Sequence, residues 1–103
     1  MTLRKGDVYD VDTGKGPRTV LVVSLDGLAE AYGAVAVLVL HAPAAHPDTA
    51  MSVRLSSPVD ASAVAVDLLQ LAASRFDTAT PHGNIGPDQQ LLVDNALRAI
   101  LDL

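Results

Sequence analysis

Two residues of the chain have side chains suited to phosphate chemistry, and each stands where an apolar run meets a loop. Arg18 follows a Gly-Pro loop and precedes the apolar run Thr19–Ser24. Its base is therefore held while its guanidinium fork can meet two phosphate oxygens at once. His41 follows the most apolar run, Ala34–Leu40, and a histidine can act as a general acid or base near neutral pH. Arg18 is therefore a candidate phosphate-binding residue, and His41 is a candidate general acid or base.

Each of these residues also has an ordinary structural interpretation. Arg18 could pair with a strand-end carboxylate such as Asp12 or Asp26, and the residues alone favour that pair slightly. His41 could be a solvent-facing polar residue that closes its strand, which is at least as well supported as a catalytic role. Asp67 and Gln70 resemble ordinary polar residues of strand ends.

Other common kinds of site lack the residues they need. The chain has no cysteine, which excludes disulfides and thiolate chemistry and suits a reducing compartment. His41, His46 and His82 do not have the spacing of zinc ligands. Gly14 and Gly16 lack the third glycine of a dinucleotide site, so a flexible hairpin-like loop is the better interpretation. We therefore expect no metal and no cofactor.

The charge is unevenly distributed along the chain. The net charge is −5, which does not suggest a nucleic-acid-binding protein. Residues 1–18, however, hold four basic and three acidic residues, so a local anion site is best sought there. No signal peptide is visible, and the longest apolar run is too short to span a bilayer. We therefore expect a cytoplasmic protein.

The spacing of apolar residues predicts a chain made mostly of strands. The predicted strands are Gly6–Val11, Thr19–Ser24, Ala34–Leu40, Met51–Ser56 and Ala63–Leu69. Between them we expect a loop at Asp12–Pro17, a short helix at Asp26–Tyr32 ended by Gly33, and a Pro- and Ala-rich connection at Ala42–Thr49. Leu71–Phe76 fits a strand or a helical turn, and Gly83–Gly86 fits a turn or a very short strand.

A terminal helix is the clearest prediction. Gly86 can serve as its N-cap, and Pro87 and Asp88 suit a helix start. One stripe carries Leu92, Ala96, Ala99 and Leu103, widened by Val93, Leu97 and Ile100. The other face carries Asp94 and Arg98, a plausible i,i+4 pair. Strands followed by a packed helix define an α+β, mainly β class in a single domain over residues 1–103.

Three segments carry a resemblance to a known family. Arg4–Asp12 resembles the opening R-G-D-[VI]-[YW]-x-[VA]-D of MazF/PemK toxins, and Pro17–Asp26 resembles their R-P-V-[LV]-V-[VI]-S-N-D. The terminal segment Asp88–Leu103 is similar to the closing helix of the family. The order and spacing of the three segments cover nearly the whole chain.

The resemblance implies a fold, partners and an activity. The fold is an SH3-like antiparallel barrel with a C-terminal helix packed on it, and the protein is a homodimer that binds an antitoxin with an acidic tail. The activity is metal-independent cleavage of single-stranded RNA at short sequences, leaving 2′,3′-cyclic phosphate ends. Arg18 matches the catalytic arginine, and His41 stands where the family usually has Thr or Ser. The RNA-binding positions are matched by Lys15, Gly16, Ser24 and Gln70.

Two other functions remain open for the same fold. One is a non-catalytic toxin-fold protein that engages an antitoxin. The other is a CcdB-like gyrase inhibitor, a class whose members resemble one another at a C-terminal Trp-Gly-Ile. The segment Leu101–Leu103 offers nothing similar, so this is the last of the three.

Overall fold

The chain folds around one six-stranded sheet with a helix packed against it. A computed structural model describes residues 3–43 and 52–101. The strand order is β4-β5-β3-β2-β1-β6, and all neighbouring strands are antiparallel. The elements are β1 (Asp7–Asp12), β2 (Pro17–Val22), α1 (Leu28–Tyr32), β3 (Ala34–His41), β4 (Ser52–Leu55), β5 (Ala61–Ala72), the 3₁₀ helix η1 (Ala73–Thr78), β6 (Thr80–Asn84) and α2 (Gly86–Leu101).

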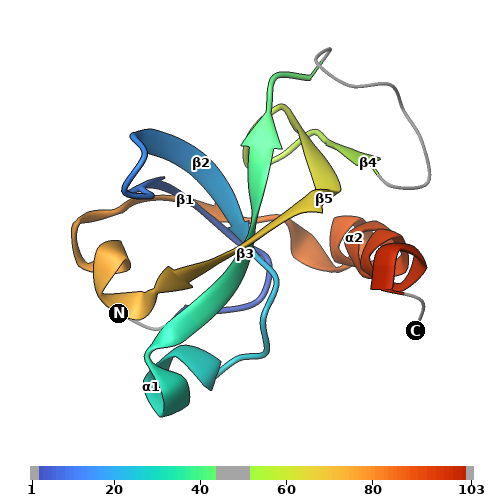
Figure 1. The fold of residues 1–103 in the computed structure, drawn as a ribbon. Helices are drawn as coiled ribbons and strands as arrows, with labels where there is room; N and C mark the ends of the chain where they lie inside the picture. The colour runs from blue at the N-terminus through green and yellow to red at the C-terminus, as the bar shows by residue number, and fades with distance from the viewer. Residues whose placement is uncertain (1–2, 44–51, 102–103) are drawn as a thin grey trace.

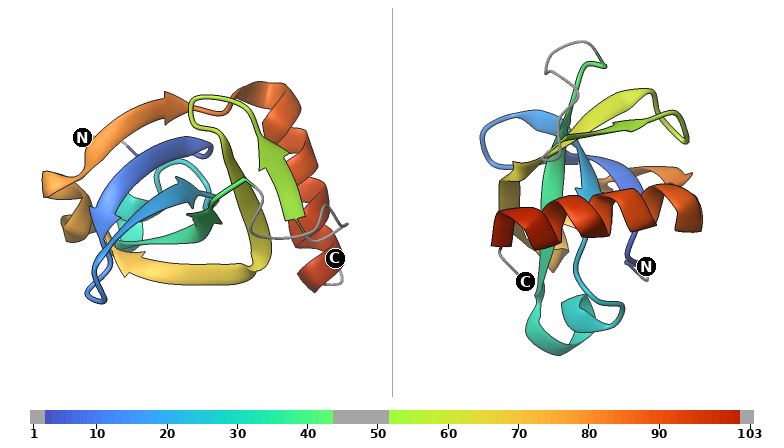
Figure 2. Two further views of the ribbon diagram at one scale, coloured as in Figure 1. Left: turned by 90° about the horizontal axis from the view of Figure 1, so that it is seen from above. Right: turned by 90° about the vertical axis from the view of Figure 1, so that its right-hand side faces the viewer.

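The sheet is curled, and apolar side chains fill the space on both of its faces. Viewed from above in Figure 2, the strands wrap around an interior, and α2 runs along one side. Side chains alternate between the two faces of a strand. Leu21 and Leu38 therefore join the apolar cluster that includes Val93 of α2, while Val20 joins the cluster that includes Phe76 of η1. The expected α+β, mainly β class with a curled antiparallel sheet and a packed terminal helix is confirmed.

Most predicted elements lie where the sequence places them. The predicted strand Thr19–Ser24 corresponds to β2, in which Val20, Leu21 and Val22 are all buried. The short helix α1 ends at Gly33, which adopts φ 69° and donates its N–H to Ala29 O at 2.8 Å. Glycine takes up this left-handed conformation without a Cβ clash, which is why it stops the helix.

Two segments differ from the prediction. The strand expected at Ala63–Leu69 runs over twelve residues as β5, and the ambiguous Leu71–Phe76 divides into the end of β5 and the start of η1. Phe76 of η1 is buried edge-on against Tyr9, with ring centroids 5.4 Å apart. Part of the connection Ala42–Thr49 lies outside the described residues.

The strand β6 was predicted only as a turn or a very short strand at Gly83–Gly86. Its sequence Thr-Pro-His-Gly-Asn has no apolar alternation, and all five residues are exposed. It joins the sheet by backbone pairing with β1, from Asp7↔Asn84 to Asp10↔Thr80. An edge strand that buries no side chain leaves no periodic signal in the sequence.

The buried face of α2 is rotated from the predicted stripe. Val93 and Ala96 are buried, and Leu97 and Ile100 pack against the same core, but Leu92 and Ala99 are exposed. Leu103 lies outside the described residues. The helix contacts β4 and β5, beside which it is seen in Figure 1. Val93, Leu97 and Ile100, which were expected only at the margin of the stripe, therefore lie in the buried face of the helix together with Ala96.

The predicted pair Asp94–Arg98 is replaced by a longer-range contact. Asp94 Oδ1 lies 3.0 Å from Lys5 Nζ, and Arg98 donates to Asn95 Oδ1 at 3.4 Å. The N-terminal segment is thereby tied to α2. No helix in the described part of the chain is long and apolar enough to cross a membrane.

Candidate functional site

His41 stands at the end of β3, held by a carboxylate from the neighbouring strand. The register of β3 against β5 shifts between Leu38 and Leu40, and this irregularity brings Asp67 of β5 to the histidine. His41 Nε2 and Asp67 Oδ2 form a close pair, with side chains 31% and 38% exposed. A carboxylate in this position orients the imidazole. From the sequence, Asp67 was interpreted as an ordinary polar residue of a strand end, and its pairing with His41 was not predicted.

The same histidine borders a cavity of about 300 Å³. Several strands and a turn contribute to the walls, among them β1 with Asp10, β2 with Thr19 and the turn before β5 with Asp60. His82 of β6 also lines the cavity. The curl of the sheet therefore brings its edge strand β6 round to face the end of β3.

A second histidine–carboxylate pair lies in this cavity. Asp10 Oδ1 accepts a hydrogen bond from Thr19 Oγ1 at 2.7 Å and lies 2.9 Å from His82 Nε2. The hydrogen bond from Thr19, followed by that from His82, lowers the pKa of Asp10 below its ordinary value. The aspartate therefore stays ionised beside the imidazole. Sequence reasoning considered His82 only as a zinc ligand and missed this arrangement, because the three residues come from three strands.

Arg18 is exposed near the start of β2 and forms neither ion pair considered for it. Its Nη1 donates to the carbonyl of Pro17 at 2.8 Å. Asp12 instead accepts the Gly14 N–H, and Asp26 accepts the Lys5 N–H. The β2–β3 ladder ends at Val20↔Val39. Arg18 pairs instead with Val11 of β1, and it is not among the residues that line the cavity at His41.

Lys15 and Gly16 lie in the tight hairpin between β1 and β2. The Thr13 N–H and hydroxyl both donate to Gly16 O, at 3.2 and 3.0 Å, so the expected loop is fixed by hydrogen bonds. Gly16 has φ 105°, a conformation that side chains other than glycine strain to adopt. The hairpin and the end of β3 lie at the end of the sheet away from α1 (Figure 1).

A third cation packs on this hairpin. Arg75 of η1 donates from Nη1 to Asp12 O at 3.3 Å, and a Cβ added to Gly14 would lie 2.9 Å from its Nη2. Lys15, Arg18 and Arg75 thus flank one hairpin, which we call the cationic hairpin. Nothing in the sequence singled out Arg75, because it lies in the segment whose structure was ambiguous.

Ser24 and Gln70 lie at the other end of the sheet. The hydroxyl of Ser24 accepts the Ala36 N–H at 3.2 Å, and Gln70 pairs with the same Ala36 across the β3–β5 ladder. Ala36 and His41 are about 17 Å apart along an extended strand. The structure therefore divides the six predicted site residues into two groups. One end of the sheet holds Lys15, Gly16, Arg18 and His41, and the other end holds Ser24 and Gln70.

Gln70 borders a wide apolar groove of about 430 Å³, whose walls include Tyr32, Leu68 and Leu69. All three are exposed large hydrophobic residues. Within residues 3–43 and 52–101, no three His, Cys, Asp or Glu side chains gather closely enough to hold a metal ion.

Solved structures resemble this chain over its whole length. An endoribonuclease from a mycobacterial species matches with a TM-score of 0.85 at 18% identity, covering 98% of this chain and 92% of the other. An endoribonuclease in complex with its cognate antitoxin, also mycobacterial, matches at 0.83 and 20% identity, covering 98% and 96%. A MazE–MazF complex from Deinococcus radiodurans matches at 0.84 and 16% identity, covering 100% and 98%.

No protein-family model matches the sequence. The search of curated proteins finds no match either. The structural matches place the chain in the fold class of small toxins with a curled sheet and a terminal helix. Its fold is that of MazF, as the three sequence segments implied.

Proposed function

We propose that the protein is the toxin of a type II toxin–antitoxin system and a metal-independent, sequence-specific endoribonuclease on single-stranded RNA. The observation that carries this proposal is the His41–Asp67 pair, whose histidine lines a cavity at the end of the sheet that also bears the cationic hairpin. A proton-transfer group and phosphate-binding cations at one end of a MazF fold are what RNA cleavage by internal transfer requires.

The chemistry uses the 2′-hydroxyl of RNA as nucleophile. Its oxygen bonds to the adjacent phosphorus while the bond to the 5′-oxygen breaks, which leaves a 2′,3′-cyclic phosphate and a 5′-hydroxyl. His41 moves a proton in this step, and the guanidinium fork of Arg18 stabilises the charge on the phosphate oxygens. Lys15 and the backbone of Gly16 hold the strand at the hairpin, and Ser24 and Gln70 contact RNA farther along the sheet.

The partners follow from the same surfaces. An acidic antitoxin tail would neutralise the cationic hairpin and cover the RNA site, ordering as it binds. A homodimer suits a chain of this size, because a small domain with few aromatic residues buries little apolar area alone. We place this activity in the cytoplasm, where mRNA and a reducing milieu meet.

Cleavage is tested with purified, antitoxin-free protein and a long single-stranded RNA in EDTA. We expect cuts at a short recurring sequence with 2′,3′-cyclic phosphate ends, lost in Arg18→Ala and in His41→Ala. Arg98→Gln is the matched control, because Arg98 is exposed on α2 and donates to Asn95 of the same helix. A folded, dimeric wild-type protein that makes no cut would contradict the nuclease proposal.

A non-catalytic antitoxin-binding protein is the second candidate. The exposed apolar groove around Tyr32, Leu68 and Leu69 favours it, because an exposed patch of large apolar side chains marks a binding surface. This candidate predicts a stable complex with an antitoxin and no cleavage in the same assay. The third reading of the fold, gyrase inhibition, has no observation in its favour.

A further inference from the structure

Two histidines, one from the inner strand β3 and one from the edge strand β6, line one cavity, and each is paired with an aspartate. His41 of β3 pairs with Asp67, and His82 of β6 pairs with Asp10. Both imidazoles contribute to the walls of the 300 Å³ cavity, and both side chains are about one-third exposed, at 31%. A substrate atom in the cavity would therefore have access to two imidazoles, the side-chain group most often used to transfer protons in catalysis.

The local backbone aims His82 at this position. β6 pairs Val8 with Gly83 but Tyr9 with Pro81, so His82 is the extra residue of a bulge. Bulges redirect a side chain out of the regular alternation and are common beside active sites. No apolar packing in this exposed strand requires an imidazole, since all five residues of β6 are exposed.

Two successive polar contacts, from Thr19 to Asp10 and from Asp10 to His82, orient the ring of His82. Thr19 donates to the same carboxylate oxygen of Asp10 that faces His82 Nε2. The threonine consumes its one proton in this bond, so it orients the carboxylate. The carboxylate in turn selects the ring orientation of His82.

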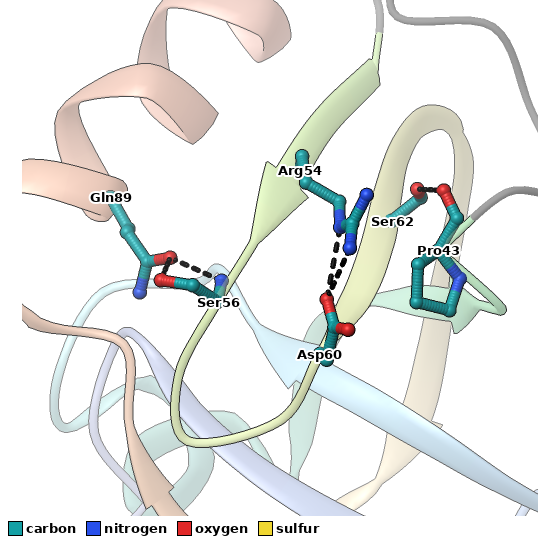
Figure 3. A network of polar contacts seen from close by, with 6 residues as sticks. All are labelled: Pro43, Arg54, Ser56, Asp60, Ser62 and Gln89. Atoms are coloured by element: carbon teal, nitrogen blue, oxygen red, sulfur yellow. Dashed lines mark hydrogen bonds and ion pairs between the residues drawn. The ribbon is translucent and has the colours of Figure 1, made fainter.

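A further acidic side chain that lines the cavity, Asp60, has a cationic partner of its own. Asp60, on the turn before β5, accepts from both Nε and Nη2 of Arg54 through one oxygen, at 2.9 and 2.8 Å (Figure 3). The end of β3 beyond His41 is fixed by Ser62, whose hydroxyl donates to Pro43 O at 3.1 Å (Figure 3). Among the described residues, Asp10, Thr19 and Asp60 line the cavity with the two histidines, and Asp67 pairs with His41.

We propose that His82 is the second acid–base residue of the site and works with His41 across this cavity, oriented by Asp10 and Thr19. This inference rests on the proposed nuclease function. In the cleavage step one imidazole takes the proton of the 2′-hydroxyl as the phosphorus–oxygen bond forms. The other gives a proton to the departing 5′-oxygen as its bond to phosphorus breaks. The protons balance, and no metal or further reactant is needed.

The proposal is tested by pH–rate profiles on a short single-stranded RNA that contains one cleavage site. With two imidazoles at work, the wild-type profile is bell-shaped. His82→Gln is expected to lose one limb of the bell and at least about 100-fold in kcat. Asp10→Asn keeps both histidines but removes the carboxylate that orients His82, so one limb of the profile is expected to move.

Circular dichroism and thermal unfolding establish that each variant is folded, and Arg98→Gln should keep the wild-type profile. Cleavage by folded His82→Gln within about threefold of wild type, with both limbs intact, would overturn this inference and leave Arg18 and His41 as the catalytic pair. Should His82→Gln fail to fold, an unmoved profile in Asp10→Asn overturns it. Absence of cleavage by the wild type would overturn the nuclease function and this inference together.

Discussion

Three aspartates, Asp10, Asp67 and Asp94, each hold a basic side chain that comes from another element of the fold. Asp10 pairs with His82, Asp67 with His41, and Asp94 with Lys5. The first two pairs present imidazoles to a cavity, whereas the third ties the N-terminal segment to α2. Two of these pairs therefore belong to the candidate site, and the Lys5–Asp94 pair contributes to the stability of the fold.

The Lys5–Asp94 pair is expected to make part of the stability depend on acid. Partial burial opposes ionisation of Asp94, but hydrogen bonds from Lys5 and Gln90, with the charges of Lys5 and Arg98, leave its pKa below the ordinary value. Because the folded-state pKa is the lower one, the stabilisation is present above the unfolded pKa of about 4. It is lost as the pH falls through the folded pKa.

Asp94→Asn is therefore expected to lower the free energy of unfolding by about 1 kcal/mol or less at pH 7. The difference from wild type should shrink as the pH falls below about 4. Urea unfolding at a series of pH values measures it, with Asp77→Asn on the exposed side of η1 as the control. A difference that stays constant from pH 7 to pH 3 would show that a neutral contact of Asp94 carries the effect.

The residues that could be predicted from sequence are those whose neighbours in the chain identify them. Arg18 and His41 were found because each borders an apolar strand, and both lie at strand ends. Asp67, His82 and Arg75 were missed as parts of the site. Each becomes meaningful only through a partner from a distant strand or loop, and a single sequence contains no record of such pairing.

Strands whose residues are buried could be predicted from the sequence, whereas strands ordered mainly by pairing with a neighbour could not. β2 and β3 were predicted because their β-branched apolar residues are buried in the sheet. β6 was not, because its exposed residues are ordered by backbone hydrogen bonds to β1. The length of β5 also escaped prediction, since its exposed second half continues only by pairing with β3.

The orientation of α2 also depends on contacts with distant parts of the chain, β4 and β5. It can be tested directly. Val93 is 1% exposed beneath the helix and Leu92 is 53% exposed on its outer side, although the two are adjacent and both lie on the predicted apolar face. Val93→Asp places an unpaired charge in the core and is expected to cost about 3 kcal/mol or more. Leu92→Asp is expected to change the free energy of unfolding by only about 0.5 kcal/mol.

Urea unfolding of the two variants at low protein concentration, where association contributes little, compares them under one condition. Equal destabilisation by the two substitutions would contradict the observed orientation of the helix. A larger effect at Leu92 would restore the stripe predicted from the sequence.

The whole molecule combines a net charge of −5 with cations gathered at one hairpin. Lys15, Arg18 and Arg75 flank that hairpin, and Arg75 reaches it from η1. Long-range attraction cannot bring RNA to an acidic protein, so binding has to come from short-range contacts at this place. The acidic remainder would also limit binding of RNA elsewhere on the surface.

A non-cleavable single-stranded oligonucleotide with 2′-deoxy sugars measures these contacts by its salt dependence. Each neutralised phosphate of a single strand contributes about 0.7 to the slope of log K against log salt. Arg75→Gln keeps a hydrogen-bond donor but removes the charge, so we expect the slope to fall by about 0.7 and the affinity at low salt to drop.

Arg98→Gln removes the same charge from α2 and should leave the slope unchanged, which separates a local contact from an effect of net charge. Equal slopes for wild type and Arg75→Gln would exclude Arg75 from the RNA path and confine the cationic hairpin to Lys15 and Arg18. Equal losses in both variants would instead show that RNA responds to the total charge of the molecule. Only a loss confined to Arg75→Gln supports a strand that passes over the hairpin on its way to the cavity between His41 and His82.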